Sequence, residues 1–118
     1  MATKVDVLVV DDDIAIFEVI ALLLDDMGLR SVHARNGREG LERAIALHPR
    51  LILTDLMMPD MRGDEMIDRL RDAPELRSIP IIMMTSAPSL RRTSVHEVLT
   101  KPFDLSTLEH IIVATLAS

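Results

Sequence analysis

The chain has 118 residues, no cysteine, 48% hydrophobic residues and a formal net charge of −6, which together indicate one folded domain and exclude a disulfide framework or a thiolate zinc site. Direct nucleic-acid binding is disfavoured as well, because the chain is acidic and has only two aromatic side chains for base stacking, Phe17 and Phe103. No run is long enough for a membrane helix and the start of the chain lacks a signal peptide, so we expect a cytoplasmic domain spanning residues 1–118 with no membrane partner.

Short apolar runs alternate with stretches of helical periodicity along the chain. The apolar runs predict five strands, at residues 5–10, 30–35, 51–55, 79–85 and 96–101. The periodic stretches predict helices at residues 14–27, 36–48, 64–72 and 104–117. This alternation is typical of an α/β fold in three layers, a doubly wound five-stranded parallel sheet with helices on both faces.

Several residues are expected to mark helix ends. Asp13 precedes the first predicted helix and is expected to cap its N-terminus, and Gly28 follows the end of that helix. In the last predicted helix, Ser106 and Glu109 are spaced like a capping box, and Asp104 is another candidate cap.

The connection between the fourth and fifth predicted strands is short and polar. Its residues 86–95 are "SAPSLRRTSV", which is too little chain for a full helix and two loops. We therefore expect one or two turns of helix there, or an irregular loop. The fourth helix of the fold, which would lie between the fourth and fifth strands and precede the helix at 104–117, is accordingly predicted to be short or irregular.

Five polar residues fall at the carboxyl ends of the predicted strands: Asp11, Asp12, Asp55, Thr85 and Lys101. Sites in open α/β sheets form outside these ends, where the strand order reverses. In the flavodoxin-like order 2-1-3-4-5 the first and third strands are neighbours, which brings the three aspartates together. Each residue alone has an ordinary explanation, such as a helix cap or a solvated lysine. Five of them at one sheet edge indicate a functional site.

The predicted cluster of carboxylates points to metal-assisted phosphoryl transfer. Two carboxylates about 5 Å apart repel by about 3 kcal/mol at an effective dielectric constant near 20. Oxygen ligands with open positions suit Mg²⁺ or Mn²⁺, which relieve that repulsion. A divalent ion, Lys101 and Thr85 around a carboxylate are what phosphoryl transfer to it requires. We therefore predict Asp55 as the nucleophile, with Asp11 and Asp12 as metal ligands.

Five motifs match one protein family: "VLVVDDD", "NGREGLE", "LILTDLMMPDMRG", "IPIIMMTS" and "LTKPFD". Over nearly its whole length the chain resembles the receiver domain of bacterial two-component response regulators, with the chemotaxis-regulator-like (CheY-like) fold. The resemblance implies a signalling receiver rather than an enzyme, one that promotes only its own phosphorylation and dephosphorylation. The implied partners are a sensor histidine kinase or a histidine phosphotransfer protein, and an output protein or fused effector domain.

The resemblance also implies roles for the metal ligands. Asp55 would accept phosphate from the phosphohistidine of a kinase. Asp12 and Asp55 would bind Mg²⁺ directly, with the backbone carbonyl of Met57 as a further ligand, and Asp11 would act mainly through a bound water.

The residues that surround the phosphoryl group in the family have implied roles as well. Thr85 would turn toward the phosphoryl group and Lys101 would pair with it. The Lys101–Pro102 peptide is commonly cis in this family.

Two features depart from the family pattern. The segment between Thr85 and Lys101 is shorter than usual, and Val98 stands where the family has a switch aromatic, three residues before the lysine. In typical members that ring moves inward together with the threonine, and valine has no ring to move. We therefore expect that activation reorders residues 86–95 instead.

Two alternative functions differ in how well they fit the sequence. A non-switching module that keeps the acidic site but signals by constitutive binding is consistent with Val98 and the short fourth helix. A flavin-binding protein of the flavodoxin type is disfavoured, because the chain lacks aromatic stacking partners and places acids where phosphate would lie. No glycine-rich dinucleotide loop is present in the sequence.

Overall fold

A computed structural model describes residues 4–118 and contains one five-stranded parallel sheet. The strand order is β2-β1-β3-β4-β5, which confirms the predicted flavodoxin-like order. The strands are β1 (Val7–Val10), β2 (Ser31–Ala34), β3 (Leu51–Asp55), β4 (Ile81–Thr85) and β5 (Glu97–Thr100).

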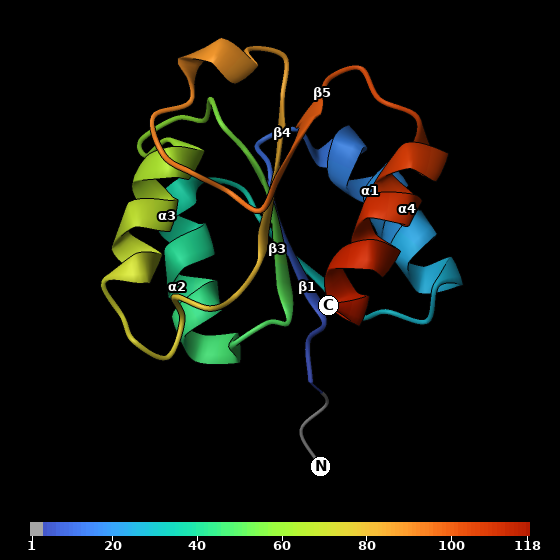
Figure 1. The fold of residues 1–118 in the computed structure, drawn as a ribbon, viewed down its shortest axis with the longest axis horizontal. Helices are drawn as coiled ribbons and strands as arrows, with labels where there is room; N and C mark the ends of the chain where they lie inside the picture. The colour runs from blue at the N-terminus through green and yellow to red at the C-terminus, as the bar shows by residue number, and fades with distance from the viewer. Residues whose placement is uncertain (1–3) are drawn as a thin grey trace.

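Four α-helices complete the three layers within residues 4–118. They are α1 (Ile14–Asp26), α2 (Gly37–Leu47), α3 (Gly63–Arg71) and α4 (Leu105–Ala117). Helices α1 and α4 cover one face of the sheet, and α2 and α3 cover the other (Figure 1). Among the described helices, none has both the length and the apolar character needed to cross a membrane.

The central strands are buried on both faces, as a parallel sheet between two helical layers requires. All four residues of β1 and the first four residues of β3 are fully buried. Alternate side chains point to opposite faces: Leu8 and Ile52 join the core on the α2–α3 side, and Val9 and Leu53 join the core on the α1–α4 side. This packing fixes the strand ends, where the polar residues lie.

The predicted helix ends are confirmed at α1 and only in part at α4. The side chain of Asp13 accepts the backbone N–H of Ala15 at 2.9 Å, and Gly28 has the positive φ of 75° that suits a residue just past a helix. The capping box of Ser106 and Glu109 is wrong. The last helix begins one residue after Asp104, so Ser106 lies inside the helix and cannot cap it. Asp104 holds the cap position, although its side chain makes no cap hydrogen bond.

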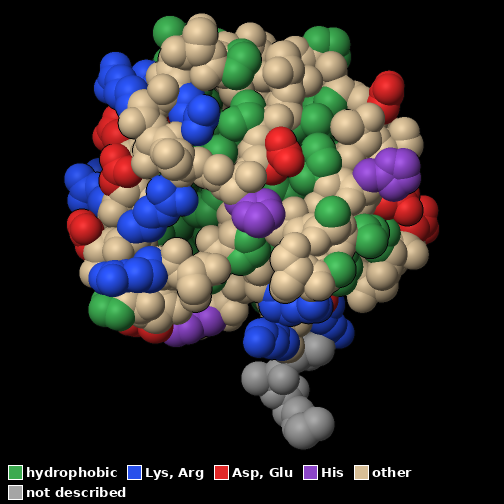
Figure 2. All heavy atoms as spheres, viewed as in Figure 1, with side chains coloured by type: hydrophobic (Ala, Val, Ile, Leu, Met, Phe, Trp, Pro, Cys, Tyr) green, Lys and Arg blue, Asp and Glu red, His purple; other side chains and the backbone are tan. Residues whose placement is uncertain are grey.

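The connection between β4 and β5 contains only a 3₁₀ turn, η1 (Pro88–Leu90). This confirms the prediction of a short or irregular segment in place of a full helix. Figure 1 shows η1 beyond the strand ends, above the start of α3. Figure 2 shows Lys and Arg side chains gathered on the α3 side of this face, and hydrophobic side chains in the hollow beside the connection. No α-helix lies between β4 and β5 in the described chain.

Candidate functional site

Three carboxylates converge at the carboxyl ends of β1 and β3. One oxygen each of Asp11, Asp12 and Asp55 lies within 4.8 Å of the other two. β1 and β3 are adjacent, with Val10 opposite Thr54, so the residues that follow these two positions are brought together. The structure thus confirms the predicted convergence. Across residues 4–118, no other group of three or more acidic or histidine side chains has this spacing.

Asp11 is fully buried and both of its carboxylate oxygens are hydrogen-bonded. Oδ1 accepts the backbone N–H of Asp13 at 2.9 Å, and Oδ2 accepts the ammonium of Lys101 at 3.0 Å. A buried carboxylate needs such partners, because losing water without them is costly. Asp11 is therefore fixed in place, whereas Asp12 is exposed.

Lys101 connects two of the three carboxylates. Its Nζ lies 3.0 Å from Oδ2 of Asp11 and 3.4 Å from Oδ2 of Asp55. Burial alone would lower the pKa of Lys101, but the hydrogen bond and charge of Asp11, followed by those of Asp55, outweigh it and raise the pKa above its ordinary value. The lysine therefore stays charged. Its peptide bond to Pro102 is cis, as expected.

Asp55 lies at the end of β3 with 15% of its side chain exposed. Burial raises the pKa of Asp55, Lys101 opposes the increase and Asp11 adds to it, and the net shift is upward. Oδ1 accepts the backbone N–H of Leu56 at 2.7 Å. In this environment the ionised form of Asp55 is disfavoured, and an added cation would stabilise it.

Thr85 is buried at the end of β4, and its hydroxyl is already engaged. Oγ1 accepts the backbone N–H of Ala87 at 3.0 Å. The backbone carbonyl of Thr85 accepts the N–H of Lys101 at 2.8 Å, which connects the end of β4 to the residue that follows β5. Val98 lies in β5 opposite Met83 and is partly buried, so the predicted switch position carries an aliphatic side chain.

The connection from β3 to α3 contains a tight turn. Asp60 has φ of 67°, and the N–H of Met61 reaches the carbonyl of Pro59 at 2.7 Å, which is the hydrogen bond of a γ-turn. Gly63 then packs so close that a Cβ would overlap the carbonyl oxygen of Asp55. A side chain at position 63 is therefore excluded by this close approach. Met57 lies in the same connection, and its carbonyl as a metal ligand stays a prediction.

His33 is a site neighbour that the sequence analysis did not identify. It lies in β2, and its Nε2 is 2.7 Å from the backbone carbonyl of Asp11. Since a carbonyl can only accept, this geometry assigns the Nε2 proton to the donor role. The ring also stacks on Phe17, with centroids 4.3 Å apart and an interplanar angle of 10°. The contact joins residues 22 positions apart, so no local pattern could have revealed it.

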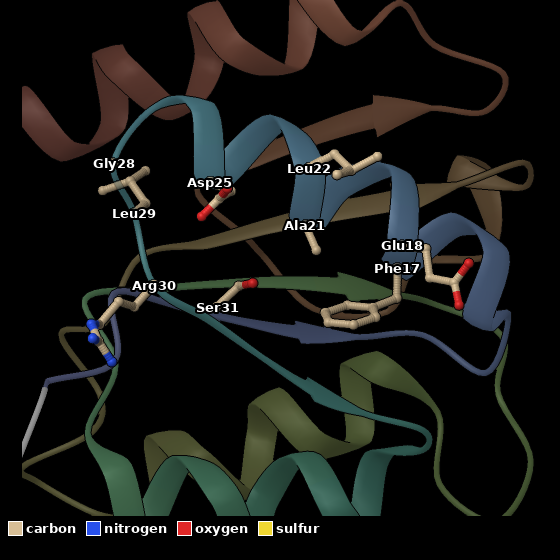
Figure 3. A pocket seen from close by; sticks show the side chains of 9 residues that line it. All are labelled: Phe17, Glu18, Ala21, Leu22, Asp25, Gly28, Leu29, Arg30 and Ser31. Carbon is tan, nitrogen blue, oxygen red and sulfur yellow. The ribbon is translucent and has the colours of Figure 1, made fainter.

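Two open grooves flank α1. The first, about 820 Å³, lies between α1 and the chain leading into β2. Figure 3 shows Phe17 pointing from α1 toward the sheet, while Leu22 points away from it. None of the three clustered aspartates lines this groove. The second, about 520 Å³ and mostly apolar, has Val19, Leu105 and Lys101 in its wall, so it opens beside the carboxylate site.

The fold and the acidic cluster at its strand ends define a receiver-type signalling domain. The chain belongs to the response regulator receiver domain family, whose model matches residues 7–113. It is therefore a receiver domain of two-component signalling, not a conventional enzyme, and domains of this family act with histidine kinases.

Similar proteins include a large kinase and small receivers. The chain is 39% identical over 103 residues to hybrid signal transduction histidine kinase D of Dictyostelium discoideum, covering 82% of this chain but 7% of that kinase. The structure of chemotaxis response regulator CheY4 of Vibrio cholerae matches with a TM-score of 0.84 and 30% identity, covering 96% of this chain and 99% of that one.

A third similar protein was solved with a metal ion. Response regulator TrrA of Thermotoga maritima, in complex with Mg²⁺ and BeF, matches with a TM-score of 0.84 and 26% identity over 96% of this chain and 99% of that one. The acidic cluster found here resembles that of Mg²⁺-binding receivers. Three carboxylate oxygens within 4.8 Å of one another fit a hard divalent cation, which prefers oxygen ligands.

Proposed function

We propose that Asp55 is the phosphoacceptor of this receiver, and that the whole chain, residues 1–118, acts as one phosphorelay domain. The observation that carries the proposal is the position of the Asp55 carboxylate. It lies between two other carboxylates within 4.8 Å and the Lys101 ammonium at 3.4 Å. In the reaction, the phosphorus–nitrogen bond of a phosphohistidine breaks and a phosphorus–oxygen bond to Asp55 forms.

The other two carboxylates are unsuited to be the acceptor. Both oxygens of Asp11 are already hydrogen-bonded and the residue is fully buried, so it cannot approach a phosphoryl donor. Asp12 is exposed and lacks the lysine contact of Asp55. Asp11, Asp12, Asp55 and the Met57 carbonyl would hold Mg²⁺ or Mn²⁺. When bound, the ion would offset the negative charge that develops on the phosphoryl oxygens.

Two side chains would contact the phosphoryl group. Lys101 already lies between Asp11 and Asp55, and its raised pKa keeps it cationic for pairing with one phosphoryl oxygen. The hydroxyl of Thr85 would donate a hydrogen bond to another phosphoryl oxygen after rotating away from the N–H of Ala87.

The donor is expected to be a protein, a sensor histidine kinase or a histidine phosphotransfer protein. The apolar groove of about 520 Å³ opens directly beside Lys101, with exposed Val19 and Leu105 at its sides. A small-molecule donor needs no apolar surface there, whereas a helix carrying a phosphohistidine would bury one. The output is an unidentified protein or a fused effector domain.

A non-switching interaction module is the second candidate. It is supported by the aliphatic Val98 and by the 3₁₀ turn that stands in place of a helix between β4 and β5. The two candidates differ in what phosphorylation changes. A non-switching module would bind its partner equally well with and without a phosphoryl group on Asp55.

Acetyl phosphate labelling tests the acceptor. The protein is incubated with acetyl phosphate and Mg²⁺ and its intact mass is measured, together with Asp55→Asn. One phosphoryl adduct on the wild type that is absent from the variant is expected. Asp68→Asn, an exposed acid on α3, is the matched control and should label normally. A wild type that neither labels nor binds beryllofluoride in the presence of Mg²⁺ would contradict the proposal.

A further inference from the structure

The connection between β4 and β5 is joined to the start of α3 by an ionic clamp built on a buried aspartate. The clamp consists of Arg62, Asp64 and the backbone of Leu90 and Arg92. The guanidinium of Arg62 donates to both oxygens of Asp64 at 3.0 Å, and its Nη2 also donates to the carbonyl of Leu90 at 2.7 Å. The N–H of Arg92 donates to Oδ2 of Asp64 at 3.0 Å.

Asp64 is 2% exposed, which makes this contact unlike an ordinary surface ion pair. Burial alone would raise the pKa of Asp64, but the hydrogen bonds from Arg62 and then from the N–H of Arg92 outweigh it and lower the pKa. The planar guanidinium matches a carboxylate in two parallel hydrogen bonds, a geometry that lysine cannot reproduce. The clamp is therefore a specific structure built on two side chains.

The other end of the same connection is fastened at the phosphoryl site. The hydroxyl of Thr85 accepts the N–H of Ala87 at 3.0 Å. Between the two fastenings lies η1, in which the N–H of Leu90 bonds to the carbonyl of Ala87 at 3.0 Å. Pro88 restricts the backbone of this turn further. The turn therefore connects Ala87 to Leu90, whose carbonyl accepts a hydrogen bond from Arg62.

The clamp can open without leaving a buried charge unpaired. If the connection moves away, Asp64 loses the Arg92 N–H and Arg62 loses the Leu90 carbonyl. The Arg62–Asp64 pair itself joins neighbouring residues and remains intact. Opening thus breaks two hydrogen bonds to backbone groups that water can then satisfy, whereas breaking the ion pair would be far more costly.

We propose that the clamp and the Thr85 hydroxyl form a latch, in which phosphorylation of Asp55 opens the clamp and releases residues 86–95. The proposal rests on the function proposed above, because it requires Thr85 to turn toward a phosphoryl group. That rotation removes the acceptor from the Ala87 N–H, and η1 carries the displacement to Leu90. The released segment, together with the hollow beside it in Figure 2, is then the surface that differs between the two states.

The latch requires that the two sites be reciprocally coupled. If binding of a phosphoryl mimic favours the open clamp, a protein whose clamp is weakened must bind the mimic more tightly, because the two equilibria are linked. Asp64→Asn and Arg62→Lys both weaken the clamp but change the charge near the site differently. Their common effect therefore cannot come from simple electrostatics. Glu65→Gln and Arg69→Lys, at exposed positions on the same helix, are the matched controls.

The test measures beryllofluoride affinity in the presence of Mg²⁺ by titration calorimetry, with circular dichroism to confirm that each variant is folded. Both clamp variants should bind at least about five-fold more tightly than the wild type, and both controls should match the wild type. If Asp64→Asn does not fold, Arg62→Lys alone carries the test. Unchanged or weaker binding by the clamp variants would overturn the latch.

Amide exchange of the wild type provides a second readout. Adding Mg²⁺ and beryllofluoride should accelerate exchange of the Arg92 amide, followed by NMR, at least about five-fold. Bound mimic with no change at Arg92 would refute the latch while leaving the phosphoacceptor role of Asp55 intact. A wild type that binds no beryllofluoride at all would instead refute the proposed function on which the latch rests.

Discussion

Replacing Asp55 by asparagine is expected to stabilise the protein when no metal is bound. Asp11 and Asp12 each place an oxygen within 4.8 Å of Asp55, and each repels it by about 3.5 kcal/mol at an effective dielectric constant near 20. Lys101 at 3.4 Å attracts it by about 5 kcal/mol on the same scale. The balance is a net repulsion of about 2 kcal/mol.

The change also weakens one favourable contact. The N–H of Leu56 bonds to an ionised oxygen of Asp55 at 2.7 Å, and a neutral amide is a weaker acceptor by about 1 kcal/mol. Asp55→Asn should therefore raise the free energy of unfolding by about 1–2 kcal/mol at neutral pH. For a domain of this size, that corresponds to an increase in melting temperature of about 4–8 °C.

The stabilisation should depend on pH in a defined direction. The pKa of Asp55 in the folded protein is raised from 3.8, so the fold favours the protonated side chain. The stability that this protonation contributes is fully present below about pH 3.8 and is lost as the pH rises through the folded-state pKa. Wild type and Asp55→Asn should thus be most alike at acidic pH, and the advantage of the variant should grow as the pH rises through this window. Urea unfolding in EDTA across that range measures it.

Magnesium should narrow the difference in stability between the wild type and Asp55→Asn. An ion at ten times its dissociation constant adds about 1.4 kcal/mol to a protein that binds it only when folded. The wild type should gain this and Asp55→Asn should gain less, while Asp68→Asn should behave as the wild type does. A variant no more stable than the wild type in EDTA at neutral pH would show that the carboxylates do not repel one another as calculated.

Three further changes have expected costs that urea unfolding can check. Lys101→Met should lower the free energy of unfolding by about 3 kcal/mol in EDTA, because it leaves buried Asp11 without a cation. Since the pKa of Lys101 is raised from 10.5, this cost should hold below pH 10.5 and disappear as the pH rises through the folded-state pKa of the lysine. His33→Phe keeps an aromatic stack but loses a hydrogen bond, so it should cost about 1 kcal/mol, against about 2 kcal/mol for His33→Ala; equal costs would contradict this. Gly63→Ala should cost about 3 kcal/mol, because its Cβ would overlap the carbonyl of Asp55, and a neutral result would contradict the close packing.

The sheet could be predicted because buried parallel strands leave a strong signal. The runs at 5–10 and 51–55 are mostly apolar, and the strand order then places Asp11, Asp12 and Asp55 together. The apolar pattern alone does not fix the strand boundaries. β1 begins at Val7 rather than residue 5, because the ladder with β2 and β3 starts there.

The contacts that the sequence could not reveal are those made across long separations. His33 reaches Asp11 over 22 positions, and Asp64 reaches Arg92 over 28. Asp64 is an acidic residue in the first turn of a helix, which by itself suggests a dipole interaction at the surface rather than a buried clamp. The capping box at Ser106 failed for the opposite reason, since a local pattern was present but the helix began two residues before it could act.

In the proposed latch, Thr85 is the residue that passes the signal from Asp55 to the 86–95 segment. Its carbonyl bond to Lys101 continues the pairing of β4 and β5 and is part of the sheet. Its hydroxyl bond to Ala87 is different, because it depends on one side-chain torsion that has three staggered positions. With Val98 lacking a ring, this hydroxyl is the adjustable contact between the site and the connection. Thr85→Val, which keeps the shape but removes the hydroxyl, should therefore separate the two functions. Asp55 should still be labelled by acetyl phosphate, while the Arg92 amide should no longer respond to beryllofluoride; a response that persists would show that the signal leaves the site by another route.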